Sequence, residues 1–163
     1  MKFITKRKFS FLAIVMMVIL FISSHTPYQK QDMKPFFKGM VMIQEEDLPP
    51  IAFTYDGALV TPSAPYEYVE FFLRKGAHVA SFGLLAFLCI MALKEQNKKA
   101  PIFLGSILAF LYALFDEFHQ SLVEGRTGHL IDVFVPDLLG ILLTLMFFLI
   151  FSQKKKHVQK PRQ

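Results

Sequence analysis

Four long apolar blocks, separated by polar stretches, constrain this sequence more than any other feature. They cover residues 9–24, 71–93, 101–115 and 130–151, and 53% of the 163 residues are hydrophobic. A helix rises about 1.5 Å per residue, so roughly 20 apolar residues cross the ~30 Å hydrocarbon core of a bilayer. The sequence therefore predicts an all-α membrane protein, a bundle of four transmembrane helices with a small extracytoplasmic loop between helices 1 and 2.

The polar stretches divide the chain into four parts. We expect a basic N-terminus with the first helix over 1–24, the loop over 25–70, a core of three helices over 71–151 and a basic tail over 152–163. Within the loop, Asp56-Gly57 lies between two short apolar runs. This pair predicts a β-hairpin, because both residue types tolerate the positive φ angles of a tight turn.

The first block is short enough to be the apolar region of a signal peptide. Cleavage after Ser23 or Ser24 would need small residues at both the −3 and −1 positions, but Phe21 or Ile22 occupies the −3 position. We therefore predict an uncleaved membrane anchor.

Basic residues gather on one predicted side of the membrane. Four Lys and Arg precede the first block, three lie in residues 94–99 and five follow the last block, which makes 12 of the 18 in the chain. Glu95 is the one acidic residue in these segments. Since Lys and Arg concentrate in cytoplasmic loops, we predict a multi-pass protein of the cell membrane with both termini in the cytoplasm.

Charge and cysteine content narrow the function classes. The basic residues flank apolar blocks instead of forming a patch with aromatic residues, so the expected partner is the lipid bilayer and not nucleic acid. Cys89 is the one cysteine and has no partner for an intramolecular disulfide. A transporter would carry ionisable groups through the full membrane depth, whereas here the predicted cytoplasmic halves of the last three helices have none.

Polar residues of the last three helices fall at the same predicted depth, near the extracytoplasmic ends. These candidate site residues are Arg74, Lys75, His78, Asp116, Glu117, His119, Gln120, Arg126, Asp132 and Asp137. Ionisable groups are costly in hydrocarbon, so they pair and face the bundle interior. We expect ion pairs of Arg74 or Arg126 with Asp116, Asp132 or Asp137. We also predict one cavity lined by His78, Asp116, His119, Arg126 and Asp132.

The spacing of two aspartates needs a local irregularity. Asp132 and Asp137 are five residues apart and diverge around a regular helix. Pro136 lies between them and predicts a kink that could bring them together.

The cluster allows three interpretations. The first is purely structural: the side chains cap the helix ends and form ion pairs that assemble the bundle. The second is that they bind an anionic ligand. A metal site is the third, with Asp116 and His119 spaced as in half of a di-iron motif and with His78 and Asp132 completing a mononuclear set. We predict no metal and no other cofactor.

Several short motifs follow one another through this region. They are Arg74-Lys75-Gly-Ala-His78, Asp116-Glu117-Phe-His119-Gln120, Gly125-Arg126, Asp132 and Asp137-Leu-Leu-Gly140. Their order resembles the VanZ-like family, as does the stretch with Ser23-Ser24, Pro27-Tyr28 and Gln31-Asp32. Two positions depart from the family pattern. Ser81 stands where an acidic residue often follows the histidine, and one extra residue is inserted around Pro136.

The resemblance implies a multi-pass bacterial protein of the cell envelope. The family's namesake is associated with low-level resistance to the antibiotic teicoplanin. Teicoplanin is a lipoglycopeptide that acts at the outer face of the membrane. The first functional hypothesis is therefore a protein that binds a lipid-linked cell-wall precursor or a lipoglycopeptide. Arg74, Lys75 and Arg126 would hold its phosphate or carboxylate.

The alternative hypothesis is a membrane-embedded hydrolase or transferase. His78 or His119 would act as general base or acid, and Asp116 would orient it. Ser81 and Ser121 lack a clear triad, so we favour the non-enzymatic interpretation.

Overall fold

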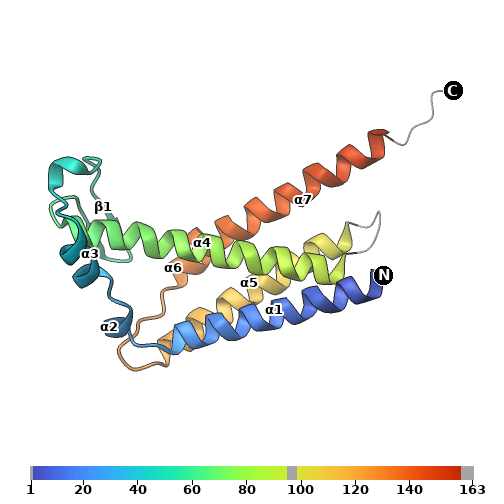
Figure 1. Ribbon diagram of the computed structural model, residues 1–163, viewed down its shortest axis with the longest axis horizontal. Coiled ribbons are helices and arrows are strands. Elements are labelled where there is room, and N and C mark those ends of the chain that lie inside the picture. The colour runs from blue at the N-terminus through green and yellow to red at the C-terminus, as the bar shows by residue number, and fades with distance from the viewer. Residues whose placement is uncertain (1, 95–98, 159–163) are drawn as a thin grey trace.

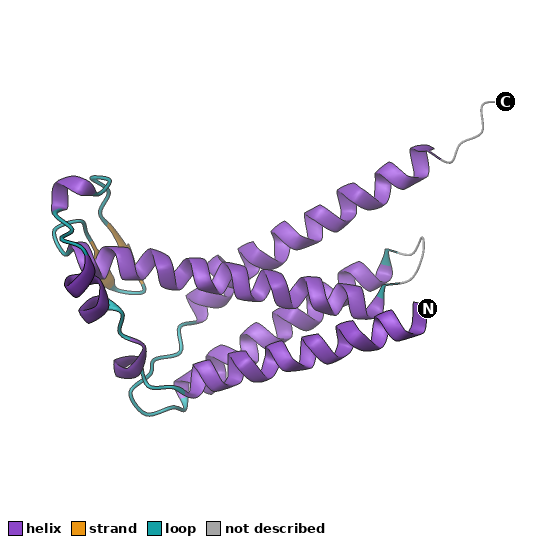
Figure 2. Ribbon diagram, viewed as in Figure 1, coloured by secondary structure: helices purple, strands orange, loops and turns teal. Residues whose placement is uncertain are grey.

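A computed structural model describes residues 2–94 and 99–158, and most of this chain is helical (Figures 1 and 2). Among these residues, four spans are long and apolar enough to cross a membrane: Lys6–His25, Pro65–Leu93, Ala100–Ser121 and Leu130–Phe151. They belong to α1 (Lys2–His25), α4 (Pro65–Leu93), α5 (Ala100–Ser121) and the continuous unit of α6 (Leu130–Asp132), η2 (Val133–Asp137) and α7 (Leu138–Val158). The predicted class, an all-α membrane protein with four spanning helices, is confirmed.

Helix α4 is the centre of the bundle. It packs against α1, α5 and α7, and α5 also contacts α1 and α7. Figure 1 shows α1 beginning and α7 ending at the same end of the bundle, with α7 diverging from α1 toward that end. We call the opposite end, which carries residues 26–64 and 122–129, the hairpin end.

The connection between α1 and α4 is a chain of short elements. It contains α2 (Tyr28–Gln31), α3 (Lys34–Met40), the 3-10 turn η1 (Glu45–Asp47) and strands β1 (Phe53–Tyr55) and β2 (Ala58–Val60). The strands pair antiparallel, with Phe53 opposite Val60. Asp56 (φ 49°) and Gly57 (φ 79°) form the turn, so the predicted hairpin is present (Figure 2).

Helix α4 begins six residues earlier than the apolar block that predicted it. Pro65 lies at the helix start, where its missing N–H is tolerated, and Glu67 lies in the first turn, where a carboxylate favours the helix dipole. Hydropathy marked the apolar part of the helix and missed its polar beginning. The full 29 residues make a helix about 43 Å long, longer than the ~30 Å hydrocarbon core.

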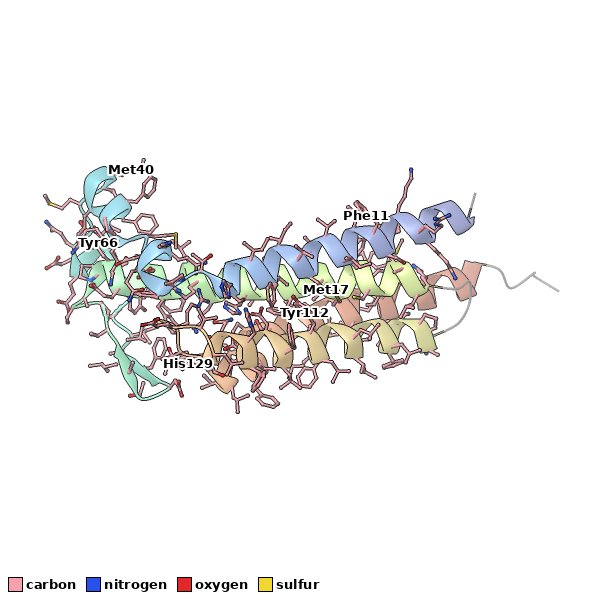
Figure 3. The ribbon with its side chains drawn as sticks, turned by 90° about the horizontal axis from the view of Figure 1, so that it is seen from below. Phe11, Met17, Met40, Tyr66, Tyr112 and His129 are labelled. Atoms are coloured by element: carbon pink, nitrogen blue, oxygen red, sulfur yellow. The ribbon has the colours of Figure 1, made fainter. Side chains whose placement is uncertain are left out.

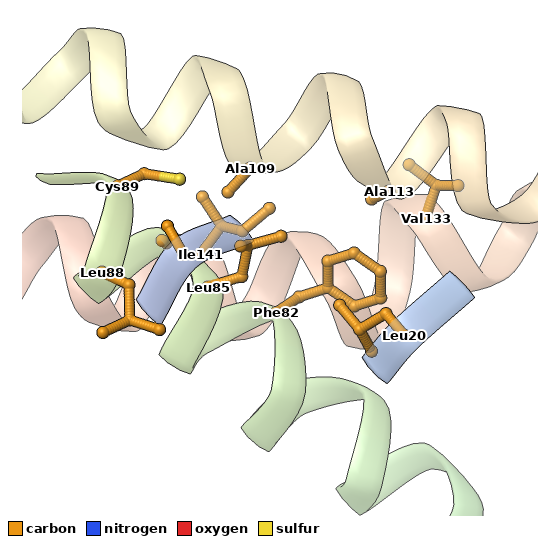
Figure 4. Close-up of a cluster of buried hydrophobic side chains, with 11 residues drawn as sticks. Leu20, Phe82, Leu85, Leu88, Cys89, Ala109, Ala113, Val133 and Ile141 are labelled. Atoms are coloured by element: carbon orange, nitrogen blue, oxygen red, sulfur yellow. The ribbon is translucent and has the colours of Figure 1, made fainter. Parts of the chain in front are cut away.

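The buried core lies where the four helices meet, and many apolar side chains face outward. Phe82, Leu85 and Ala113 are almost completely buried within it (Figure 4). In contrast, Phe11 on α1 (Figure 3) is more than half exposed. Leu104 on α5 is also more than half exposed. An apolar surface of this extent is typical of contact with lipid.

Small residues let α4 and α7 approach closely. A Cβ atom on Gly140 would lie 2.1 Å from the backbone oxygen of Val79, and one on Gly83 would lie 3.2 Å from the oxygen of Gly140. Thr144 donates a hydrogen bond of 3.0 Å from Oγ1 to the Gly83 oxygen. Such contacts between small residues are a common way to pack membrane helices, and here they occur next to the candidate site.

Candidate functional site

A π-helical turn lies at Pro136, where the sequence predicted a local irregularity. Residues Val133–Asp137 form η2, and the N–H of Leu138 donates to the oxygen of Val133, five residues back. Residues five apart in an α-helix point about 140° away from each other, whereas the wider π turn accommodates one extra residue. The insertion inferred from the sequence around Pro136 is therefore this turn, and it brings Asp132 and Asp137 to the same side.

Both aspartates bind side chains of α4. Nζ of Lys75 donates to the two carboxylate oxygens of Asp132 at 2.6 and 2.7 Å. Nδ1 of His78 lies 2.8 Å from Oδ1 of Asp137. Asp132 is 5% exposed and Asp137 is fully buried, so these contacts fix the start of the fourth span against α4.

The hairpin also reaches this pair. The hydroxyl of Tyr55 donates to Oδ1 of Asp132 at 2.6 Å, and Nζ of Lys75 lies 4.6 Å from the centre of the Tyr55 ring. Burial raises the pKa of the Tyr55 phenol above its usual value, and the charge of Asp132 adds to this shift. The phenol therefore stays protonated and can donate.

Helix α5 contributes two buried carboxylates and an amide. Asp116 accepts hydrogen bonds from Oγ of Ser24 at 2.6 Å and from Nε2 of Gln120 at 2.9 Å. Glu117 accepts from the backbone N–H of His129 at 2.8 Å. Both carboxylates are 2% exposed, and α1 and the α5–α6 connection each satisfy one of them.

The two arginines lie between the bundle and the connection after α1. Arg74 donates from Nη2 to Oε1 of Glu70 at 3.0 Å, and its guanidinium lies 4.5 Å from the centre of the Tyr28 ring. Arg126 donates to three neutral oxygens: the backbone oxygen of Thr26 at 3.1 Å, Oε1 of Gln31 at 2.5 Å and Oε1 of Gln120 at 2.8 Å.

The predicted ion pairs of the arginines with Asp116, Asp132 or Asp137 are therefore wrong. Lys75 and His78 already occupy the two aspartates after Leu130. Helical rotation explains this, because Lys75 lies about 100° around α4 from Arg74. Arg74 instead pairs with Glu70, one turn earlier on its own helix.

Two neighbouring cavities open among these side chains, with volumes of about 230 and 460 Å³. Both are lined by Arg74, His78, Gln120 and Arg126. The smaller one also contacts Asp116 and the apolar side chains of Leu20, Leu73 and Phe82. The larger one also contacts Lys75, His129 and Asp132. Of the five residues expected around a single cavity, four thus line this pair of cavities.

His119 is the exception. Its ring stacks on Phe21 of α1 with centroids 4.2 Å apart, and it lines neither cavity. Helix α1 packs against this face of α5, so the histidine lies among aromatic rings. The metal ligand set considered from the sequence, which included His119, is therefore not assembled. His78, Glu117 and Asp137 come together instead, each with a potential ligand atom within 4.8 Å of the others.

Sequence reasoning missed contributors from α1 and the connection after it. These are Ser24, Tyr28, Gln31, Tyr55 and Glu70. Ser24, Tyr28 and Gln31 belong to the stretch that resembles the VanZ-like family, but that resemblance implies no role for them. Tyr55 and Glu70 carried no comparable signal, since they lie outside the apolar blocks.

A family comparison covers both the helices and this site. The model of the VanZ/LLP1 family matches residues 9–152. The chain belongs to the VanZ/LLP1 family. No curated protein and no solved structure matches it. Family membership and the four apolar helices together make this chain a multi-pass membrane protein of the VanZ-like type.

Proposed function

We propose that this VanZ-like protein binds an anionic, lipid-linked ligand in the two cavities, with the hairpin end on the outer side of the cell membrane. One observation carries the proposal, and it concerns the partly buried guanidinium of Arg126. Among the residues that the structure describes, all of its hydrogen-bond acceptors are neutral oxygens. Carbonyl and amide oxygens satisfy its N–H groups but supply no counter-charge. A phosphate or carboxylate would supply both.

The electrostatic surroundings support an anion at this place. Burial lowers the pKa of Arg126, and the neighbouring charge of Arg74 lowers it further. Asp116 and Glu117 oppose this shift without contacting the guanidinium. The cationic form therefore loses stability through burial and like-charge repulsion, and an anion between the two arginines would restore it.

The cavity lining favours an amphiphile over a free ion. Leu20, Leu73 and Phe82 line the smaller cavity beside the two arginines. An anionic head group could contact the guanidinium groups while the adjoining apolar chain contacts these side chains. Lipid-linked cell-wall precursors and lipoglycopeptides both have this chemistry, and the membership in the VanZ/LLP1 family directs the test toward them.

The test uses Arg126→Lys, which keeps the charge and removes the planar fork that holds two oxygens of one anion. The purified full-length protein in nanodiscs is titrated with a polyprenyl phosphate and with the matching polyprenol, which lacks the anion. We expect tighter binding of the phosphate, and an affinity about tenfold lower for the variant, the equivalent of ~1.4 kcal/mol. Arg7→Lys, near the start of α1, is the matched control and should bind like the wild type.

A cellular experiment links binding to resistance. Membrane abundance and teicoplanin sensitivity are measured together for wild type, Arg126→Lys and Arg7→Lys. We expect Arg126→Lys to lose its effect on sensitivity at unchanged abundance. Equal binding of phosphate and polyprenol, or a phenotype that follows abundance alone, would refute the proposal.

A second candidate function is a membrane-embedded hydrolase or transferase. The contact between His78 and Asp137 favours it, because a carboxylate can orient an imidazole for proton transfer. Incubation with a polyprenyl diphosphate should then release a product detectable by mass spectrometry, and His78→Gln should abolish the release. An unchanged substrate with the wild-type protein would remove this candidate.

A further inference from the structure

We propose that His78, Glu117 and Asp137 form a binding site for one divalent transition-metal ion. The three residues come from α4, α5 and η2, and each offers one potential ligand atom within 4.8 Å of the other two. Nδ1 of His78 and Oδ1 of Asp137 are 2.8 Å apart. Two ligand atoms bound at about 2.1 Å and at right angles lie about 3 Å apart, so this pair needs little movement to share an ion.

A buried oxygen without a partner is the second observation. Asp137 is fully buried, and its Oδ2 atom has no hydrogen-bond partner within residues 2–94 and 99–158. Leaving a buried carboxylate oxygen without a hydrogen-bond partner destabilises the folded protein. Since the other two members of the cluster lie directly beside this carboxylate, a cation among them would satisfy it.

The charges of the surrounding groups point the same way. Four buried carboxylates lie at or next to the site, and two cationic side chains accompany them: Asp116, Glu117, Asp132 and Asp137 against Lys75 and Arg126. With His78 neutral, the formal balance is two negative charges. Buried like charges repel strongly in a medium of low dielectric, and one divalent ion would cancel the excess.

The donor set selects the class of ion. One imidazole nitrogen and two carboxylate oxygens suit Zn²⁺ or Mn²⁺, whereas Mg²⁺ and Ca²⁺ prefer oxygen ligands alone. Three protein ligands leave at least one coordination position for water or another oxygen ligand. His78 also lines both cavities, so one of the three proposed ligands contacts them. The ion does not require the anionic ligand proposed above.

The wild-type protein provides the first test. Full-length protein without an affinity tag is stripped with a chelator in detergent, then titrated with Mn²⁺ while EPR records the signal of the free ion. Zn²⁺ retained after gel filtration is measured by elemental analysis. We expect one equivalent of either ion to bind and to raise the melting temperature. No stoichiometric binding of Mn²⁺ or Zn²⁺ would overturn the proposal, whatever the variants do.

Matched variants locate the ion. Glu117→Gln and Asp137→Asn each remove one proposed ligand with little change in shape, and we expect each to lower the affinity for Zn²⁺ at least tenfold. Asp116→Asn removes the same charge from the neighbouring position of α5 and is the control, with a loss of less than threefold. Binding that is equally strong in all three variants would place the ion elsewhere and overturn the assignment. An equal loss of Zn²⁺ affinity in all three variants would show that the effect comes from net charge alone. This result would also overturn the assignment.

Discussion

Substitution of Gly140 tests the helix contact that holds the polar site together. In Gly140→Ala the new methyl carbon would lie 2.1 Å from the oxygen of Val79 and 2.9 Å from the nitrogen of Gly83. Carbon atoms and their neighbours in a packed interior sit near 3.5 Å, so α4 and α7 must separate by more than about 1 Å. Both obstructing atoms belong to the backbone and cannot escape by changing a rotamer.

The expected effect is a loss of stability of about 2 kcal/mol. Overpacking of this kind costs about 1–3 kcal/mol, and we take the upper value because backbone must move. The higher helix propensity of alanine offsets this loss of stability by ~1 kcal/mol. For a chain of this size the difference corresponds to a melting temperature lower by roughly 4–8 °C. Asp137 lies three residues before Gly140, so the separation also lengthens its contact with His78.

The assay is thermal unfolding of the purified protein in detergent, with Gly76→Ala as the matched control. Gly76 is also in a membrane helix, but a Cβ atom there meets nothing within 4 Å. This variant should melt at the wild-type temperature or slightly above it. If both variants melt within a degree of each other, the close crossing of α4 and α7 cannot be the reason why glycine occupies position 140.

Two further predictions concern η2 and the membrane orientation. Deletion of Pro136 should restore a regular α-helix and rotate Asp132 by about 100° away from Lys75. We therefore expect cross-linking between cysteines placed at positions 75 and 132 to fall at least tenfold. Undiminished cross-linking would contradict the role of the π turn. Reporter fusions should indicate the outer side at Gly125 and the cytoplasm after Lys99, and the opposite pattern would refute the orientation on which the proposed function depends.

The sequence predicted the features that depend on local pattern. The four apolar blocks predicted all four spanning helices. Asp56-Gly57 predicted the hairpin, because its turn chemistry is local. The insertion around Pro136 was also detectable, since it changes a count of residues along one helix. The form that it takes, a π turn, depends on packing against α4.

The partners of the charged residues were beyond the sequence. A pattern of charges does not reveal helix rotation, and a shift of one residue, from Arg74 to Lys75, decides which cation meets Asp132. His119 was misplaced for a similar reason, because α1 covers its face of α5. The hydrogen bond between Ser24 and Asp116 joins positions 92 residues apart, and no local signal predicts such a contact.

The length of α4 determines how a ligand could reach the arginines. Arg74 is the tenth residue of a 29-residue helix, so about 13 Å of helix precedes it and about 29 Å follows it. The second length is close to the ~30 Å thickness of the hydrocarbon core, so Arg74 would lie at the boundary between acyl chains and head groups if these residues span the core. A lipid-anchored ligand would therefore arrive by diffusion within the leaflet and need not leave the membrane. Its occupancy would depend on its mole fraction among the lipids and not on its concentration in water.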